Sequence, residues 1–167
     1  MWLRCAAVLL ALTFGIGADP TLGSSAPVDA DQIGAWQSEP LHIATADGDI
    51  VFHVEIAADA GTQRRGLMFR EKLEADAGML FLFGMDARRS FWMHNTLISL
   101  DLVFIRSDGT IAAIVEDATP KSNEIISPVE FAASVLEINA GTARARGIAV
   151  GDKVSHPALK AFVDGLP

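Results

Sequence analysis

The chain has 167 residues, half of them apolar and a fifth charged, with a formal net charge of −8. This composition is typical of one globular domain and argues against a disordered chain. An acidic chain is repelled by phosphate backbones, and the arginine pairs at 64–65 and 88–89 are too short to form a basic stripe. Nucleic acid is therefore not an expected partner.

The first eighteen residues have the pattern of a secretory signal peptide. Arg4 supplies a positive charge, residues 6–16 form an apolar run too short for a stable membrane span, and small residues lead to a cleavage position after Ala18. An uncleaved N-terminal anchor is the alternative. Residues 19–40 are expected to be a flexible tether to one domain over 41–167. We expect an exported protein, periplasmic or secreted, with no membrane span after cleavage.

Cysteine and histidine usage restricts the chemistry of the domain. Cys5 lies inside the predicted signal, so the remaining chain has no disulfide and no thiol nucleophile. The histidines are scattered without a metal-ligand spacing. We therefore expect neither a metal nor a cofactor. A thioether copper site built from the methionines is the weaker alternative, because methionines beside Leu and Phe are typically core residues.

A β-hairpin and a short helix open the predicted domain. Residues 41–45 and 52–56 alternate apolar and polar side chains, and the Asp47-Gly48 pair between them favours a turn. Asp59 is a suitable N-cap for a helix over residues 60–65, and the glycine that follows is a natural C-terminal stop.

Short strands dominate the rest of the chain. Apolar runs predict strands at 79–83, 91–93, 100–105, 111–115, 135–139 and near Val154. A helix is expected from Thr142 to Gly147, a helical turn at 159–163, and a long functional or mobile loop at 117–132. Strands outnumber helices and no βαβ repeat is present. The sequence thus predicts a mainly β domain (α+β at the margin), a compact β-sandwich or barrel-like fold of short, mostly antiparallel strands with two short helices.

Several motifs together resemble the family known as domain of unknown function 192. They are Arg65 to Arg70, Gly78 to Phe81, Phe91 to Thr96, Leu100-Asp101, Val135 to Glu137, Gly141, Gly147 and Gly151-Asp152. The resemblance covers about Leu41 to Ser155 and implies a small, mainly β domain of a kind that is often exported. The family brings no activity with it. Its members usually carry Lys or Arg where this chain has His94.

The segment 92–96 concentrates residue types suited to a small pocket. If strand alternation continues here, Trp92 and His94 share one face, and together with Asn95 they offer an aromatic wall and hydrogen-bonding groups. The alternative is that Asn95 and Thr96 form a turn whose side chains bond the nearby backbone.

Two carboxylates interrupt apolar strands. Asp101 lies within 100–105 and Glu137 within 135–139, where a carboxylate either faces solvent or needs a partner. Arg65 and Arg70 are the available partners. We expect Arg65 to pair with Asp101, since its guanidinium suits a bidentate contact, and Arg70 is the alternative. The candidate ligand-binding residues are therefore Arg65, Trp92, His94, Asn95, Thr96, Asp101 and Glu137.

Three functions follow from these residues. The first is an exported module that binds a small polar molecule or an envelope protein near Trp92, Asn95 and Asp101. The second is a hydrolase-like enzyme that uses Asp101 and Glu137 with Arg65. The third is a scaffold without a small-molecule site that works through the 117–132 loop. The sequence does not decide whether the protein is an enzyme.

Overall fold

The computed structural model describes residues 38–164, in which seven strands form one mixed sheet of order β5-β4-β6-β3-β2-β1-β7. The strands are β1 (Glu39–Thr45), β2 (Gly48–Ala57), β3 (Ala77–Ala87), β4 (Leu100–Ile105), β5 (Ile111–Ala118), β6 (Ala132–Asn139) and β7 (Lys153–Ser155). The described helices are α1 (Ala60–Arg65), α2 (Thr142–Ala145) and α3 (Pro157–Asp164). None of them is long and apolar enough to cross a membrane. The expected signal at 1–18 and all but the end of the expected tether at 19–40 lie outside the described residues.

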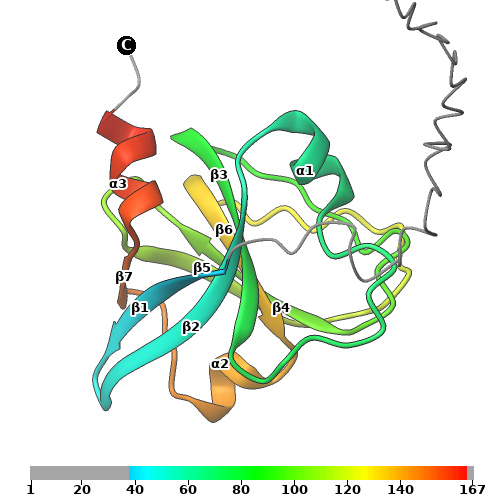
Figure 1. The fold of residues 1–167 in the computed structure, drawn as a ribbon, viewed down its shortest axis with the longest axis horizontal. Helices are drawn as coiled ribbons and strands as arrows, with labels where there is room; N and C mark the ends of the chain where they lie inside the picture. The colour runs from blue at the N-terminus through cyan, green and yellow to red at the C-terminus, as the bar shows by residue number, and fades with distance from the viewer. Residues whose placement is uncertain (1–37, 165–167) are drawn as a thin grey trace, which may run out of the picture. The chain divides into compact units, whose positions relative to one another are not determined.

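The strand pairing is antiparallel with one exception. The β1–β2 hairpin has the register that its alternation predicts, with Leu41 opposite Phe52. Strands β2 and β3 are parallel, and α1 lies in the crossover between them. The sheet curls strongly (Figure 1). The mainly β, mostly antiparallel prediction is confirmed, and the barrel-like form is the one observed, since a single curled sheet takes the place of two stacked sheets.

The two end strands of the curled sheet meet at one place. Val154 N donates to Gly109 O at 2.8 Å, Ile111 N donates to Asp152 O at 2.9 Å, and Thr110 forms a bridge with Lys153. Gly109 has φ +82°, and a Cβ there would lie 2.5 Å from the Val154 carbonyl oxygen. Only glycine therefore fits the turn that brings these edges together.

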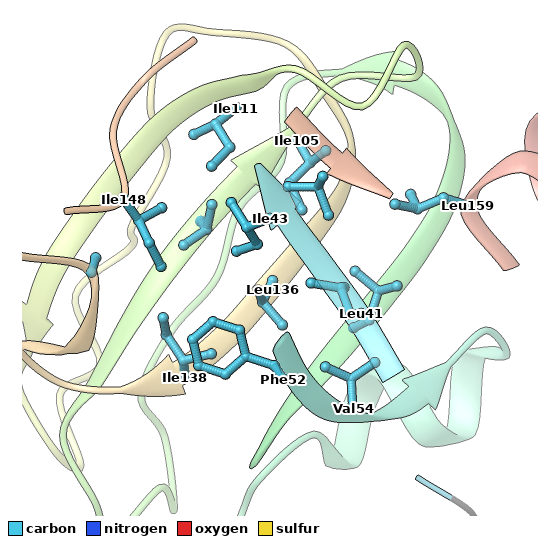
Figure 2. Packing of buried hydrophobic residues seen from close by; sticks show 14 of the residues in the cluster. Leu41, Ile43, Phe52, Val54, Ile105, Ile111, Leu136, Ile138, Ile148 and Leu159 are labelled. Carbon is cyan, nitrogen blue, oxygen red and sulfur yellow. The ribbon is translucent and has the colours of Figure 1, made fainter. Parts of the chain in front are cut away.

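Buried apolar side chains form two clusters, one on each side of the central strands. The inner cluster fills the curl (Figure 2) and contains Leu41, Ile43, Phe52, Val54, Leu80, Leu82, Val103, Ile105, Ile111, Leu136, Ile138, Ala143, Ile148, Val154 and Leu159. The outer cluster lies on the other face of β3, β4 and β6 and contains Ala57, Leu67, Met79, Phe81, Met93, Leu100, Leu102, Phe104, Ala118, Ala132 and Val135. Segments 66–76, 88–99 and 119–131 cover this outer face with side chains of their own.

Some boundaries differ from those expected. The predicted strand at 91–93 is wrong: Phe91 makes a single bridge with Ile126, and the chain turns at Asn95, whose φ is +57°. Phe91 and Met93 are apolar because they pack in the outer cluster, not because they join the sheet. The long loop is present over 119–131, while the predicted helical turn near the C-terminus extends to the whole of α3.

Replacing Phe52 with alanine tests the inner cluster. Phe52 is fully buried, so Phe52→Ala is expected to lower the free energy of unfolding by about 3 to 5 kcal/mol. Val150 is 63% exposed, so Val150→Ala should change it by less than about 0.5 kcal/mol. Urea unfolding measures both variants. A loss below about 1 kcal/mol for Phe52→Ala contradicts the packing described here.

Candidate functional site

Asp101 is a structural residue that holds backbone amides. It is fully buried, and its carboxylate accepts hydrogen bonds from Asp117 N at 2.9 Å, Gly141 N at 3.0 Å and Ala143 N at 2.9 Å. These bonds attach the end of β5 and the start of α2 to β4. The expected ion pair with Arg65 is not formed, because these amides satisfy the carboxylate and Arg65 lies exposed at the end of α1.

The two strand carboxylates lie on opposite faces of the sheet. In the β4–β6 register, Asp101 is opposite Ile138 and Leu102 is opposite Glu137. Ile138 belongs to the inner cluster and Leu102 to the outer cluster. Since side chains of neighbouring paired residues share a face, Asp101 points inward and Glu137 outward. The two-carboxylate arrangement expected of a hydrolase-like site is therefore absent from this part of the chain.

Glu137 is a buried carboxyl without a partner. It lies between Met79 of β3 and Leu102 of β4 and is 6% exposed. Burial raises the pKa of Glu137 to about 8, and no hydrogen bond or ion pair reaches its carboxyl from residues 38–164. A buried carboxyl normally has such a partner. Glu137 therefore pays a desolvation cost that nothing in the described chain offsets.

The Glu137 side chain lines a small cavity at the C-terminal end of α1. The cavity holds about 40 Å³ and is also lined by Thr96, Trp92 and residues 63–68. A groove of about 320 Å³ adjoins it, since both are lined by Gln63, Arg64, Phe81, Phe91 and Trp92. We call the cavity and groove together the Glu137 groove. It joins a narrow polar end to a wider aromatic part.

The aromatic part of the Glu137 groove is built around Phe91. The Phe91 ring meets Phe81 edge to face at 5.2 Å, Phe83 at 6.1 Å and Phe104 at 6.0 Å between centroids. Such edge-to-face contacts fix ring orientation. Trp92, beside it, is 48% exposed. A large aromatic surface thus stands open to solvent next to a rigid aromatic base.

Two turns with positive φ and a stack of two rings lie next to Trp92 of the groove. Phe69 and Asn95 both have positive φ, +65° and +57°, and Phe69 N donates to Asn95 O at 2.9 Å. His94 stacks on Trp92 at 4.8 Å, and its Nδ1 lies 2.8 Å from Asn123 Oδ1. Left-handed conformations in non-glycine residues are costly and occur often at functional sites. Here they fix the loop that carries Trp92.

The sequence-predicted residues separate into three groups. Arg65, Trp92, Thr96 and Glu137 all line the cavity. His94 lies beside Trp92 and stacks on its ring. Asn95 lies in a turn, which the alternative interpretation expected, but the turn is closed by the backbone bond from Thr96 N to Met93 O and not by the side chains that it invoked. Asp101 is on the other face. Sequence reasoning missed Gln63 and assigned Phe81 and Phe91 to the core only, since their apolar runs gave no sign that one edge of each ring lines a groove.

Other groups in the described chain are weaker candidates for a site. No cluster of three His, Asp or Glu side chains in residues 38–164 is arranged to hold a metal. A cavity of about 570 Å³ lies between β7 and α3 and contains His156, whose side chain is fully buried. His156 Nε2 is buried and makes no hydrogen bond with a described residue, although Glu39 Oε2 lies 3.5 Å away. Glu137, in contrast, forms no ion pair with any residue in 38–164.

A double-mutant cycle tests the assignment of Asp101. Asp101→Ala leaves buried amides without an acceptor and is expected to cost about 3 to 5 kcal/mol of unfolding free energy. Arg65→Ala should cost less than about 0.5 kcal/mol, with coupling between the two changes below about 0.5 kcal/mol. Asp101→Asn serves if the alanine variant does not fold. A coupling energy above about 1 kcal/mol would contradict this assignment and support an Arg65–Asp101 ion pair.

The pH dependence of stability tests the state of Glu137. Its folded pKa lies above the ordinary value of 4.5, so the folded protein keeps this proton over a range where the unfolded chain has lost it. Retention of this proton adds to the free energy of unfolding. The added stability is complete below about pH 4.5 and is lost as pH rises to about 8, and it amounts to at most about 5 kcal/mol. We expect urea unfolding from pH 5 to 9 to show this decline in the unmodified protein, but not in Glu137→Gln. The exposed Glu124→Gln is the matched control; an unchanged decline in Glu137→Gln contradicts the assignment.

Comparisons with known proteins place this domain among uncharacterised relatives. A structure from Sinorhizobium meliloti 1021, described as a "putative transcription regulator", is 41% identical, with a TM-score of 0.70 over 73% of this chain and 95% of that chain. A protein of unknown function from Novosphingobium aromaticivorans DSM 12444 is 34% identical, with a TM-score of 0.72 over 84% of this chain and 100% of that chain. No curated protein matches.

The family comparison agrees with these structures. The DUF192 family model, described as "Uncharacterized ACR", matches residues 42–156, a range that includes every residue lining the Glu137 groove. The match covers more than half of the chain and most of its described part. The chain belongs to the DUF192 family.

Proposed function

We propose that this DUF192 domain is an exported binding module and that the Glu137 groove is its ligand site. The observation that carries the proposal is the buried, unpartnered carboxyl of Glu137 at the end of a groove with an exposed tryptophan. A desolvated carboxyl without a partner is a cost to folding, and a ligand group that bonds to it offsets that cost. Concave, mostly apolar sites with few polar groups are typical of small-molecule binding.

The shape of the Glu137 groove favours a ligand with two unlike ends. The cavity of about 40 Å³ accommodates one small polar group beside Glu137 and Thr96. The adjoining groove of about 320 Å³ accommodates an apolar ring or short chain against Phe91 and Trp92. The ligand class is therefore a small molecule that joins a compact polar group to an apolar body.

Binding is favoured over hydrolysis by the separation of the two carboxylates. General acid–base hydrolysis usually needs two groups that reach one substrate, and Asp101 lies on the other face with its oxygens occupied by amides. The description of the S. meliloti relative as a regulator of transcription is not extended to this chain, because its charge of −8 opposes contact with DNA.

Export is proposed from the N-terminal sequence. The positive residue, apolar run and small residues of positions 1–18 have the order of a cleavable signal, which supports a periplasmic or secreted protein. In that compartment the groove is open to nutrients, envelope components and their fragments.

A protein-interaction role is the second candidate. Ile125, Val129 and Phe131 on the 119–131 segment are 64%, 69% and 56% exposed. Apolar side chains exposed together on one segment are typical of a contact surface for another protein. This role needs no ligand in the Glu137 groove.

Fragment binding to the purified full chain tests the proposed function. We expect molecules that join a polar group to a phenyl ring to shift the NMR signals of the Trp92 indole and of residues 63–68. At a hundred times its Kd, such a ligand stabilises the fold by about 2.7 kcal/mol. Trp92→Ala should weaken binding at least tenfold, and the control Phe131→Ala should not. Binding that is lost in Phe131→Ala but kept in Trp92→Ala would favour the interaction surface instead.

A further inference from the structure

We propose that the Glu137 groove takes a primary ammonium group, carried on an apolar or aromatic body, with the nitrogen in the small cavity beside Glu137 and Thr96. This inference rests on the proposed function, because it names the ligand class for the same site. It comes from the kinds of atoms that line the cavity.

The cavity presents hydrogen-bond acceptors. Glu137 contributes a carboxyl and Thr96 a hydroxyl, and no partner from residues 38–164 bonds to either. An ammonium group has three donors and no acceptor. It therefore satisfies these oxygens together, whereas a ligand carboxylate at the same place would face another carboxyl.

The C-terminal end of α1 lies beside the cavity. Gly66 N donates to Thr62 O at 2.8 Å and Met68 N donates to Arg65 O at 3.1 Å. These bonds occupy the carbonyls of Thr62 and Arg65. The carbonyls of Gln63 and Arg64 between them have no donor from the described chain, and both residues line the cavity. Unsatisfied carbonyls at a helix C-terminus attract cations.

Aromatic rings complete the site. Phe81, Phe91 and Trp92 line both the cavity and the groove. The negative face of an aromatic ring attracts a cation. The domain already has this contact next to the site, where the Arg89 guanidinium lies 4.4 Å from the centre of the Phe83 ring.

Among residues 38–164, no lysine or arginine forms an ion pair with Glu137. Arg70 is held by both of its terminal nitrogens to Glu55, and the side chains of Arg64 and Arg65 are exposed at the rim. Solvent screens these rim charges, so they oppose an incoming cation only weakly. Arg65→Ala should therefore raise the affinity for an amine by up to about threefold.

The size of the cavity selects among cations. About 40 Å³ suffices for an ammonium nitrogen and its hydrogens, which occupy about the space of one water molecule. A trimethylammonium group is several times larger and has no N–H to donate. The inference therefore specifies a primary amine and excludes a quaternary one.

Probes that share one body and differ in the head group test the proposal. We expect calorimetry at pH 8 to show that 2-phenylethylamine binds at least tenfold more tightly than 2-phenylethanol. The probes 3-phenylpropionate and N,N,N-trimethyl-2-phenylethylammonium should bind more weakly than the amine. Glu137→Gln should weaken the amine at least tenfold and change the alcohol less than threefold. Glu124→Gln, an exposed change of the same kind, should alter neither.

The pH dependence of the amine affinity gives a second readout. Burial raises the pKa of Glu137 to about 8, so below that pH an ammonium must displace a proton. The affinity should rise by up to about tenfold per pH unit from pH 6 to 8 and then level off. Apolar Met79 and Leu102 flank Glu137 on the sheet, and the charged groups at the rim are Arg64 and Arg65. Arg89 lies on the Phe83 ring of the groove, and His94 stacks on Trp92. Arginine keeps its charge from pH 6 to 8, so His94 is the group to test, and His94→Gln should keep the same rise.

The outcomes separate the two proposals. Tighter binding of the alcohol or the propionate, lost in Trp92→Ala, overturns the ammonium inference and leaves the groove as the ligand site. Absence of Trp92-dependent binding by every probe and fragment overturns the proposed function as well. If Glu137→Gln does not fold, Thr96→Val takes its place, with an expected loss of at least threefold for the amine.

Discussion

Burial of strands β3, β4 and β6 on both faces is the constraint on which the rest of the structure depends. One face closes over the inner cluster through the curl of the sheet. The other face is too apolar to remain in water, so segments 66–76, 88–99 and 119–131 fold across it. These segments contribute apolar side chains to the outer cluster, and two of them carry residues of the Glu137 groove. The groove thus lies where covering loops meet a doubly buried sheet.

The two strand carboxylates show how differently a buried charge can be accommodated. Asp101 faces the inner side and accepts hydrogen bonds from three backbone amides, which compensate the burial of its carboxyl. Glu137 faces the covering loops and has no bonding partner among the described residues, so its proton is retained. The first arrangement strengthens the fold. The second arrangement weakens the fold, because no described residue compensates the desolvation of the Glu137 carboxyl.

The sequence predicted where most strands lie, but not to which face of the sheet their polar residues point. The hairpin of β1 and β2 was visible because one face is wet and the side chains alternate accordingly. Strands β4 and β6 are apolar on both faces, so nothing in their pattern showed that Asp101 and Glu137 point in opposite directions. The amides that bind Asp101 come from up to 42 residues away and carry no signature in side-chain chemistry. Trp92 and Glu137 could be named as candidates by residue type alone, whereas their common cavity with Thr96 required the fold.

Strand β7, the last strand of the described chain, pairs with β1, the first. Its middle residue, Val154, also donates a backbone hydrogen bond to Gly109 in the β4–β5 turn. The ribosome produces β1 near the start of the domain and β7 near its end. Until residue 155 has emerged, the outer edge of β1 has no partner, and unpaired strand edges readily recruit strands from other molecules. A chain that ends before Lys153 would leave this edge of β1 unpaired, because β7 is the strand that covers it.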